Sequence, residues 1–148
     1  MKYSTQLSDA VHIMVFIAIN PDSDLSSNAI ATSIQTNPSF VRQIMMKLRK
    51  AELMTSVTGH AKPSLSKDAY QITLYDIYKA VEGEKPLLHL DTHTNPECGV
   101  GVNIQLALQD YYDEIQKTVE MKMKGISLQD IIDSYHGRVK NIDWNQSK

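Results

Sequence analysis

The stretch that decides the fold is residues 25–51, which reads LSSNAIATSIQTNPSFVRQIMMKLRKA. Its serines can cap a short helix that carries isoleucine and alanine on one face. Residues 35–37 then form a three-residue turn, because Asn37 is a favourable N-cap and Pro38 a favourable first helical residue. The second helix should run to about Ala51. Two helices joined by so short a turn predict a helix-turn-helix, whose second helix enters the major groove of DNA.

The second helix has two distinct faces. Its apolar side chains recur at helical spacing and should pack on the preceding helices: Val41, Ile44, Met45 and Leu48. A second set has the same spacing and should face outward: Ser39, Arg42, Gln43 and Met46. Arginine pairs best with guanine and glutamine with adenine, so Arg42 and Gln43 are expected to read bases. The alternative interpretation is a polar helix surface without a partner.

Charge is distributed unevenly along the chain. The formal net charge of the 148 residues is −2, but residues 36–67 hold six basic side chains against Glu52 alone. This segment therefore has a balance of +5, and the rest of the chain carries −7. A basic segment on an acidic body attracts phosphates while limiting indiscriminate binding. The alternative is a solvated helix face that is rich in lysine and arginine.

A small β-wing should follow the second helix. Residues 54–57 and 62–66 favour strands joined by a turn, and a helix-turn-helix with such a hairpin is a winged helix. Gly59 gives the tip backbone freedom, while His60 and Lys62 would lie where a wing touches phosphates or the minor groove. The candidate DNA contacts of the whole region are Ser26, Ser27, Pro38, Ser39, Phe40, Arg42, Gln43, Arg49, Gly59, His60 and Lys62.

Helices are also predicted on both sides of this region. The first spans residues 8–20 with Ser8 as its cap, and its apolar surface makes it a core helix. Another spans residues 74–81, between a Thr73 cap and a stop at Gly83. Both should pack against the helix-turn-helix.

A long helix is predicted at residues 102–124, after a loop at residues 84–101. Its apolar residues form a stripe with steps of three and four: Ile104, Leu108, Tyr111, Ile115 and Val119. One chain of this size hardly needs so long an apolar edge, so two such helices should pair in a homodimer. Packing within one chain is the alternative. A last helix should run from Ser127 to Ile132, and the tail from Gly137 is expected to be loosely attached or disordered.

Other classes of function find little support. The chain has no P-loop, no dinucleotide-binding glycine motif, no zinc-protease motif and no nucleophile elbow, so an enzyme is not expected. His89, His93 and Cys98 are the candidate sensor residues, but their spacing matches no strong zinc pattern and no metal is expected. The longest apolar run, residues 11–19, is far shorter than the roughly 20 residues that cross a bilayer. A single cysteine agrees with a reducing compartment, and the cytoplasm is the expected location.

Taken together, these motifs resemble the Rrf-two family of bacterial transcriptional regulators, the group that includes IscR, NsrR and CymR, and especially its YwnA-like branch. The segments that carry the resemblance cover most of residues 1–133: MKYS at 1–4, the helix at 7–18, LSSNAIA at 25–31, NPSFVRQIMMKLRKA at 37–51, ITLYDIYKAVEG at 72–83 and DTHTNPEC at 91–98.

The resemblance implies a dimeric winged helix-turn-helix repressor or activator, mainly α with a small β-wing, whose long helix builds the dimer. The expected division is a DNA-binding region at residues 1–83, a sensor loop at 84–101, dimerisation helices at 102–135 and a flexible tail at 136–148. Double-stranded DNA and a second copy are the expected partners, and the effector is unknown. The second hypothesis is a redox or small-molecule sensor that acts through protein contacts and binds little DNA.

Three departures from the family matter. Members with an iron–sulfur cluster hold three cysteines in the loop, whereas this chain has Cys98 alone, so no such cofactor is expected. The wing reads TGHAKP at residues 58–63 and lacks the arginine with which many relatives reach DNA. Arg42 stands where IscR has a glutamate that discriminates bases, so the preferred DNA site should differ.

Overall fold

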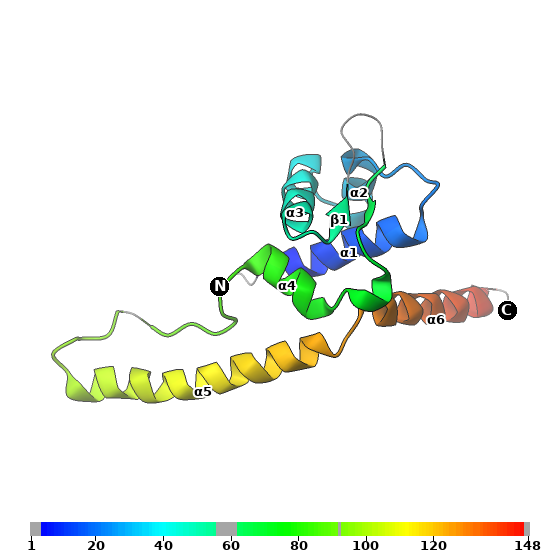
Figure 1. The fold of residues 1–148 in the computed structure, drawn as a ribbon. Coiled ribbons are helices and arrows are strands. Elements are labelled where there is room, and N and C mark those ends of the chain that lie inside the picture. Colours follow the sequence, from blue (N-terminus) through cyan, green and yellow to red (C-terminus); the bar gives the residue numbers. More distant parts are fainter. Residues whose placement is uncertain (1–3, 56–61, 92, 147–148) are drawn as a thin grey trace.

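The structure is a computed structural model that describes residues 4–55, 62–91 and 93–146, the last six of them as backbone only. Within these residues the chain is mostly helical, with one small antiparallel sheet (Figure 1). Its elements are α1 Gln6–Ile19, α2 Ser27–Ile34, α3 Pro38–Lys50, β1 Met54–Thr55, β2 Ser64–Leu65, the 3₁₀ helix η1 Ala69–Gln71, α4 Leu74–Glu82, α5 Gly99–Lys124 and α6 Leu128–Gln146. The predicted fold class, mainly α with a small β-wing, is confirmed.

The core lies among α1, α2, α3 and α4. Ile13, Ile30, Leu48 and Ile77, one from each of these helices, are fully buried. Leu128 at the start of α6 is buried in the same cluster, so the end of the chain returns to the core. Burying an aliphatic side chain of this size contributes about 1.5–3 kcal/mol, and this packing holds the helix-turn-helix rigid.

The helix-turn-helix has the predicted boundaries. The Ser26 hydroxyl accepts a hydrogen bond from the backbone N–H of Ala29 at 3.2 Å and caps the start of α2. The C-cap of α2 is Gln35, which has the left-handed conformation (φ 64°). Asn37 Oδ1 accepts the N–H of Phe40 at 2.8 Å, and Pro38 is the first residue of α3. These caps set where each helix begins and so orient α3.

The wing is present as a short hairpin. β1 and β2 pair antiparallel, with Met54 opposite Leu65 and Thr55 opposite Ser64. The hydroxyls of Thr55 and Ser64 are 2.8 Å apart and join the two strands further. The predicted tip, including Gly59 and His60, lies outside the described residues.

α4 also follows its prediction. Thr73 Oγ1 accepts the N–H of Asp76 at 3.1 Å, and Asp76 Oδ2 accepts the N–H of Thr73 at 3.0 Å. The helix ends before Gly83, whose φ of 63° favours glycine. This reciprocal capping box fixes the entry into α4.

Two helices begin earlier than predicted. α1 starts at Gln6 rather than Ser8, and Leu7, one of the two added residues, packs against the core. α5 starts at Gly99 rather than Val102, so residues 99–101 belong to the helix and not to the loop. The two glycines in this first turn hid the start, although each costs only about 1 kcal/mol relative to alanine.

The end of the chain differs most from expectation. α6 continues through Gly137 to Gln146 instead of stopping at Ile132, so the tail predicted to be disordered is helical as far as the structure describes it. The helix is well started, because Ser127 Oγ accepts the N–H of Asp130 at 3.0 Å and Asp130 Oδ2 accepts that of Ser127 at 2.9 Å. A single glycine is too weak a signal to end it.

In the part of the chain that the structure describes, no helix has the length and apolar character to span a bilayer.

Candidate nucleic-acid interface

The outer face of α3 is the candidate reading surface. Ser39, Arg42, Gln43 and Met46 are all exposed, and Met46 keeps 61% of its surface open to solvent. The opposite face is buried, with Val41, Ile44 and Leu48 at 1% exposure or less. The predicted division of this helix into two faces is therefore confirmed, and the outer face stands on a rigid scaffold.

Arg42 is held near the start of α3. Its Nη2 donates a hydrogen bond to the hydroxyl of Ser39 at 3.2 Å. This contact uses one of the five N–H donors of the guanidinium. The side chain lies on an exposed helix face, where the remaining donors are open to a partner. A guanidinium can bind a guanine edge or a phosphate through two parallel hydrogen bonds.

A carboxylate lies at the start of α2. Ser26 donates its backbone N–H to Asp24 Oδ1 at 2.9 Å, and this bond is the main reason that the pKa of Asp24 is lowered. The Ser26 side chain and, more weakly, the charge of Lys62 act in the same direction. Ser26, a candidate DNA contact, therefore holds a carboxylate that sequence reasoning missed and that would repel a phosphate.

One exposed basic side chain of this region is already engaged within the chain. Lys47 Nζ donates to Gln6 Oε1 at 2.8 Å and to the carbonyl of Val81 at 3.4 Å, so it fastens α3 to α1 and α4. Lys62 is exposed on the wing, whereas Arg49 is half-buried.

Three other candidate contacts are less open to a partner. Phe40 packs against the core from a half-buried position, which favours its structural interpretation. Pro38 and Ser27 are half-buried as well.

The candidate sensor residues are not brought together. Among the described residues, no three or more histidine, cysteine or acidic side chains are grouped to hold a metal ion. His93 Nδ1 lies 3.5 Å from Asp91 Oδ1 in the open. Cys98 is the N-cap of α5, where its exposed Sγ accepts the N–H of Gly101 at 3.4 Å. His89 is also exposed.

The predicted stripe on α5 is largely open to solvent. In this helix, all of which the structure describes, no residue is buried. Ile104, Tyr111 and Ile115 are 55%, 64% and 44% exposed, while Leu108 and Val119 are half-buried. Figure 1 shows α5 extending away from the helical body, with the preceding loop running beside it.

Comparison with known proteins identifies the family that has this architecture. A family model described as "Rrf2: Iron-dependent Transcriptional regulator" matches residues 3–134. The chain belongs to the Rrf2 family.

Individual Rrf2 relatives agree with this assignment. YwnA of Bacillus subtilis (strain 168), named an HTH-type transcriptional regulator, is 36% identical over 129 residues, which are 87% of this chain and 96% of YwnA. A crystal structure described as a DNA binding protein is 35% identical, with a TM-score of 0.71, over 86% of this chain and 98% of that one. The structure of T. potens IscR shares the fold at 23% identity, with a TM-score of 0.66, over 91% and 88% of the two chains. The resemblance inferred from the motifs is confirmed.

The Rrf2 description raises the question of an iron cofactor. Cluster irons are held by cysteine thiolates, usually four for each cluster. The whole chain has one cysteine, Cys98, whose Sγ caps α5, and among the described residues no group of three or more histidine, cysteine or acidic side chains could hold a metal ion. The residues present do not fit a cluster of that kind.

Proposed function

We propose that this Rrf2 protein is a homodimeric, sequence-specific DNA-binding regulator that represses transcription in the bacterial cytoplasm and has no catalytic role. The observation that carries the proposal is the exposed polar face of α3 on a buried helix-turn-helix, with Arg42 and Gln43 at its centre. These side chains have the donors that base edges in the major groove accept. Two other exposed candidates, Ser39 and Lys62, would hold the phosphates on either side.

The exposed stripe of α5 supports the proposed dimer. Its unburied apolar stripe, with Ile104, Tyr111 and Ile115 the most exposed members, would be covered by the same stripe of a second copy. One α3 can read only a half-site, whereas two linked copies can read half-sites about 34 Å apart. Linkage raises affinity because the second contact becomes intramolecular.

The regulator would work without a family-type iron–sulfur cluster, because one cysteine in each chain supplies only two thiolates in a dimer. Repression needs nothing beyond occupancy, since a protein bound across a promoter blocks access to it. A signal would act by changing how the two α3 helices are held relative to one another. The loop before α5 is the expected place where such a signal is sensed.

Binding to DNA tests the proposal. The protein should select duplexes with two related half-sites from a random pool, and its affinity should fall steeply with salt as phosphate contacts release counterions. The same duplex placed in a reporter promoter should lower expression when the protein is present.

Failure to select any duplex would instead support the alternative, a sensor acting through protein contacts. Activation of the reporter would overturn the repressor assignment alone.

A further inference from the structure

The junction between α5 and α6 is fastened to the start of α4. Leu74 donates its N–H to the carbonyl of Ile126 at 2.8 Å, and Leu128 donates its N–H to the carbonyl of Ile72 at 2.7 Å. Leu128 is also fully buried. The C-terminal end of α5 is therefore anchored to the winged helix through backbone hydrogen bonds.

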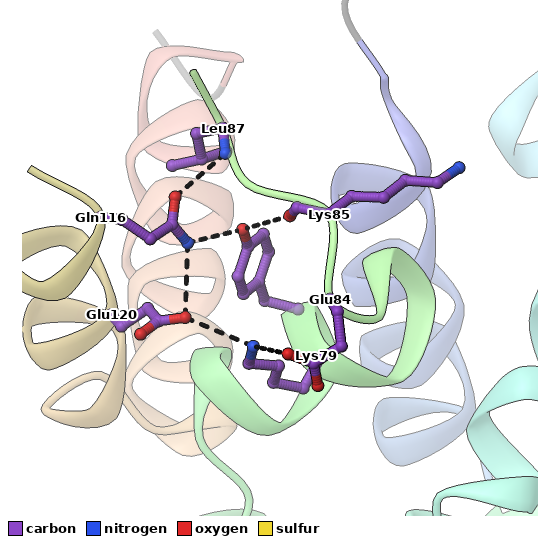
Figure 2. A network of polar contacts seen from close by, with 7 residues as sticks. Lys79, Glu84, Lys85, Leu87, Gln116 and Glu120 are labelled. Atoms are coloured by element: carbon purple, nitrogen blue, oxygen red, sulfur yellow. Dashed lines mark hydrogen bonds and ion pairs between the residues drawn. The ribbon is translucent and has the colours of Figure 1, made fainter. Parts of the chain in front are cut away.

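A second attachment lies further along α5. Gln116 Nε2 donates to the Tyr78 hydroxyl at 3.0 Å and to Glu120 Oε1 at 3.3 Å, while Gln116 Oε1 accepts the N–H of Leu87 at 3.0 Å (Figure 2). The Tyr78 hydroxyl in turn donates to the carbonyl of Lys85 at 3.2 Å. Gln116 therefore joins α5 at one point to α4 and to the loop that follows it.

The partners of Gln116 are themselves well held. Tyr78 is 1% exposed, so its ring is fixed in the body of the winged helix. Glu120 lies 3.4 Å from Lys79, which also lies 3.5 Å from Glu84. Partial burial acts to lower the pKa of Lys79, but the hydrogen bond to Glu120 and the charge of Glu84 outweigh it and leave that pKa raised. The ammonium stays charged and keeps Glu120 in place.

A helix that is attached at two points along its length has a fixed direction, whereas a helix attached at one end alone can swing. Gln116 and Ile126 are ten residues apart, which is about 15 Å along an α-helix. Between and beyond these points, no residue of α5 is buried. Little fully buried apolar packing therefore opposes a swing about the α5–α6 junction. The Lys79–Glu120 ion pair and the Lys124 ammonium over the Tyr75 ring also join α5 to α4, but both lie nearer that junction. Among the described residues, Gln116 makes the polar attachment to α4 that is furthest from the junction and so has the longest lever arm against a swing.

We propose that Gln116 is a positioning residue that sets the angle between the winged helix and α5, and thereby the half-site separation that the dimer accepts. This inference rests on the proposed function, because α5 must join two DNA readers for its angle to matter. With Gln116 in place, the two α3 helices stand at one separation. Without the Gln116 contacts, each winged helix can turn about its α5–α6 junction, so the dimer accepts several half-site separations.

The experiment compares the spacing preferences of full-length variants. Parent protein first selects sites from random duplexes about three helical turns long. Affinity is then measured on the selected duplex, on duplexes with one base pair added or removed between the half-sites, and on a single half-site. One base pair shifts the half-sites by about 3.4 Å and turns one against the other, so the parent should lose about tenfold or more.

Two variants and one matched control make the test specific. Gln116→Ala and Tyr78→Phe should reduce that loss to about threefold, with the affinity for a single half-site unchanged. Tyr78→Phe keeps the buried ring and removes only the hydroxyl. Gln109→Ala should behave as the parent, because Gln109 Nε2 donates to Asp113 Oδ1 within α5 at 2.7 Å. Thermal unfolding checks that each variant is folded.

The outcomes separate the inference from the function on which it rests. Variants that keep the parental spacing preference, or that lose affinity for the single half-site and the full site alike, would overturn the role of Gln116 while leaving DNA binding intact. A parent that tolerates every spacing would do the same. A parent that selects no duplex would overturn the proposed function, and this inference with it.

Discussion

At the scale of single residues, Arg42 carries the most specific expectation. Its guanidinium lies on the exposed face of α3 and is steadied by Ser39 at 3.2 Å. If it binds a guanine edge, Arg42→Ala should cost roughly 1–3 kcal/mol on the selected duplex and relax the preference at one base pair. Titrations on the selected and on scrambled duplexes measure both effects.

Lys62→Ala is the matched comparison for Arg42. Lys62 is exposed on the wing, where a lysine contacts phosphates as a point charge. Its loss should weaken all duplexes alike and reduce the salt slope by about one. Equal losses for Arg42→Ala on selected and scrambled DNA would make Arg42 a phosphate contact too.

Cys98 carries a second residue-level prediction. Its Sγ is exposed and accepts the N–H of Gly101 at the start of α5. Peroxide can oxidise the Cys98 thiol to a sulfenic acid with release of water. Because the chain has no second cysteine, that sulfenic acid can form a disulfide only with an added small thiol or with Cys98 of a second copy, again with release of water. Oxidation should weaken DNA binding of the parent and leave Cys98→Ser unaffected, since serine is itself a good N-cap. Unchanged affinity after complete thiol modification would show that Cys98 is an inert cap.

At the scale of elements, the capping box of α4 should be measurable. Thr73 and Asp76 satisfy each other's backbone N–H, and α4 supports both α3 and the Tyr78 contact to α5. Thr73→Ala should lower the free energy of unfolding by about 1 kcal/mol. Urea unfolding at one fixed protein concentration measures the change.

Thr118→Ala is the control for the capping box. Thr118 is exposed within α5 and donates only to the carbonyl of Glu114 in its own helix. Its removal should change stability by no more than about 0.5 kcal/mol. A loss equal to that of Thr73→Ala would mean that the capping box adds nothing beyond a surface threonine.

Local signals account for most of the elements that sequence predicted. Caps and prolines act on the next few residues, so the boundaries of α2, α3 and α4 follow from Ser26, Asn37 and Thr73. The errors arise where tertiary contacts or weak breakers decide. Gly99 and Gly137 both lie in helices, because the cost of one glycine is small beside the cooperative gain of a longer helix.

The candidate site shows the same limit. The outward direction of Arg42 and Gln43 follows from periodicity, because the buried residues of α3 leave only one face for them. The hydrogen bonds of Lys47 do not follow from periodicity, since its partners Gln6 and Val81 come from other helices. The pairing of Gln116 with Tyr78 spans 38 residues and leaves no periodic trace. Such contacts are visible only once the elements are packed.

At the scale of the whole molecule, three features of the proposal depend on one another: the exposed face of α3, the long helix α5, and the Gln116–Tyr78 contact that joins α5 to the winged helix. α3 is useful for recognition only if α1 and α4 hold it rigid, and α5 is useful for pairing only if its stripe stays open. The Gln116 contact lies between these two parts. A change at α5 can therefore alter DNA binding without touching α3.

The last prediction concerns pairing through α5. Replacing Leu108 and Ile115 by aspartate places two charges in the stripe, where a partner helix would have to bury them, so the variant should be monomeric. Leu106→Asp is the control, because Leu106 is 60% exposed and lies about two and a half turns from Ile115, on the opposite face. Sedimentation at micromolar concentration should show a dimer for the parent and the control. The monomeric variant should also lose its affinity for the selected duplex, because a single α3 can bind only one of the two half-sites. A monomeric parent, or a double variant that still pairs, would exclude this stripe as the dimer interface.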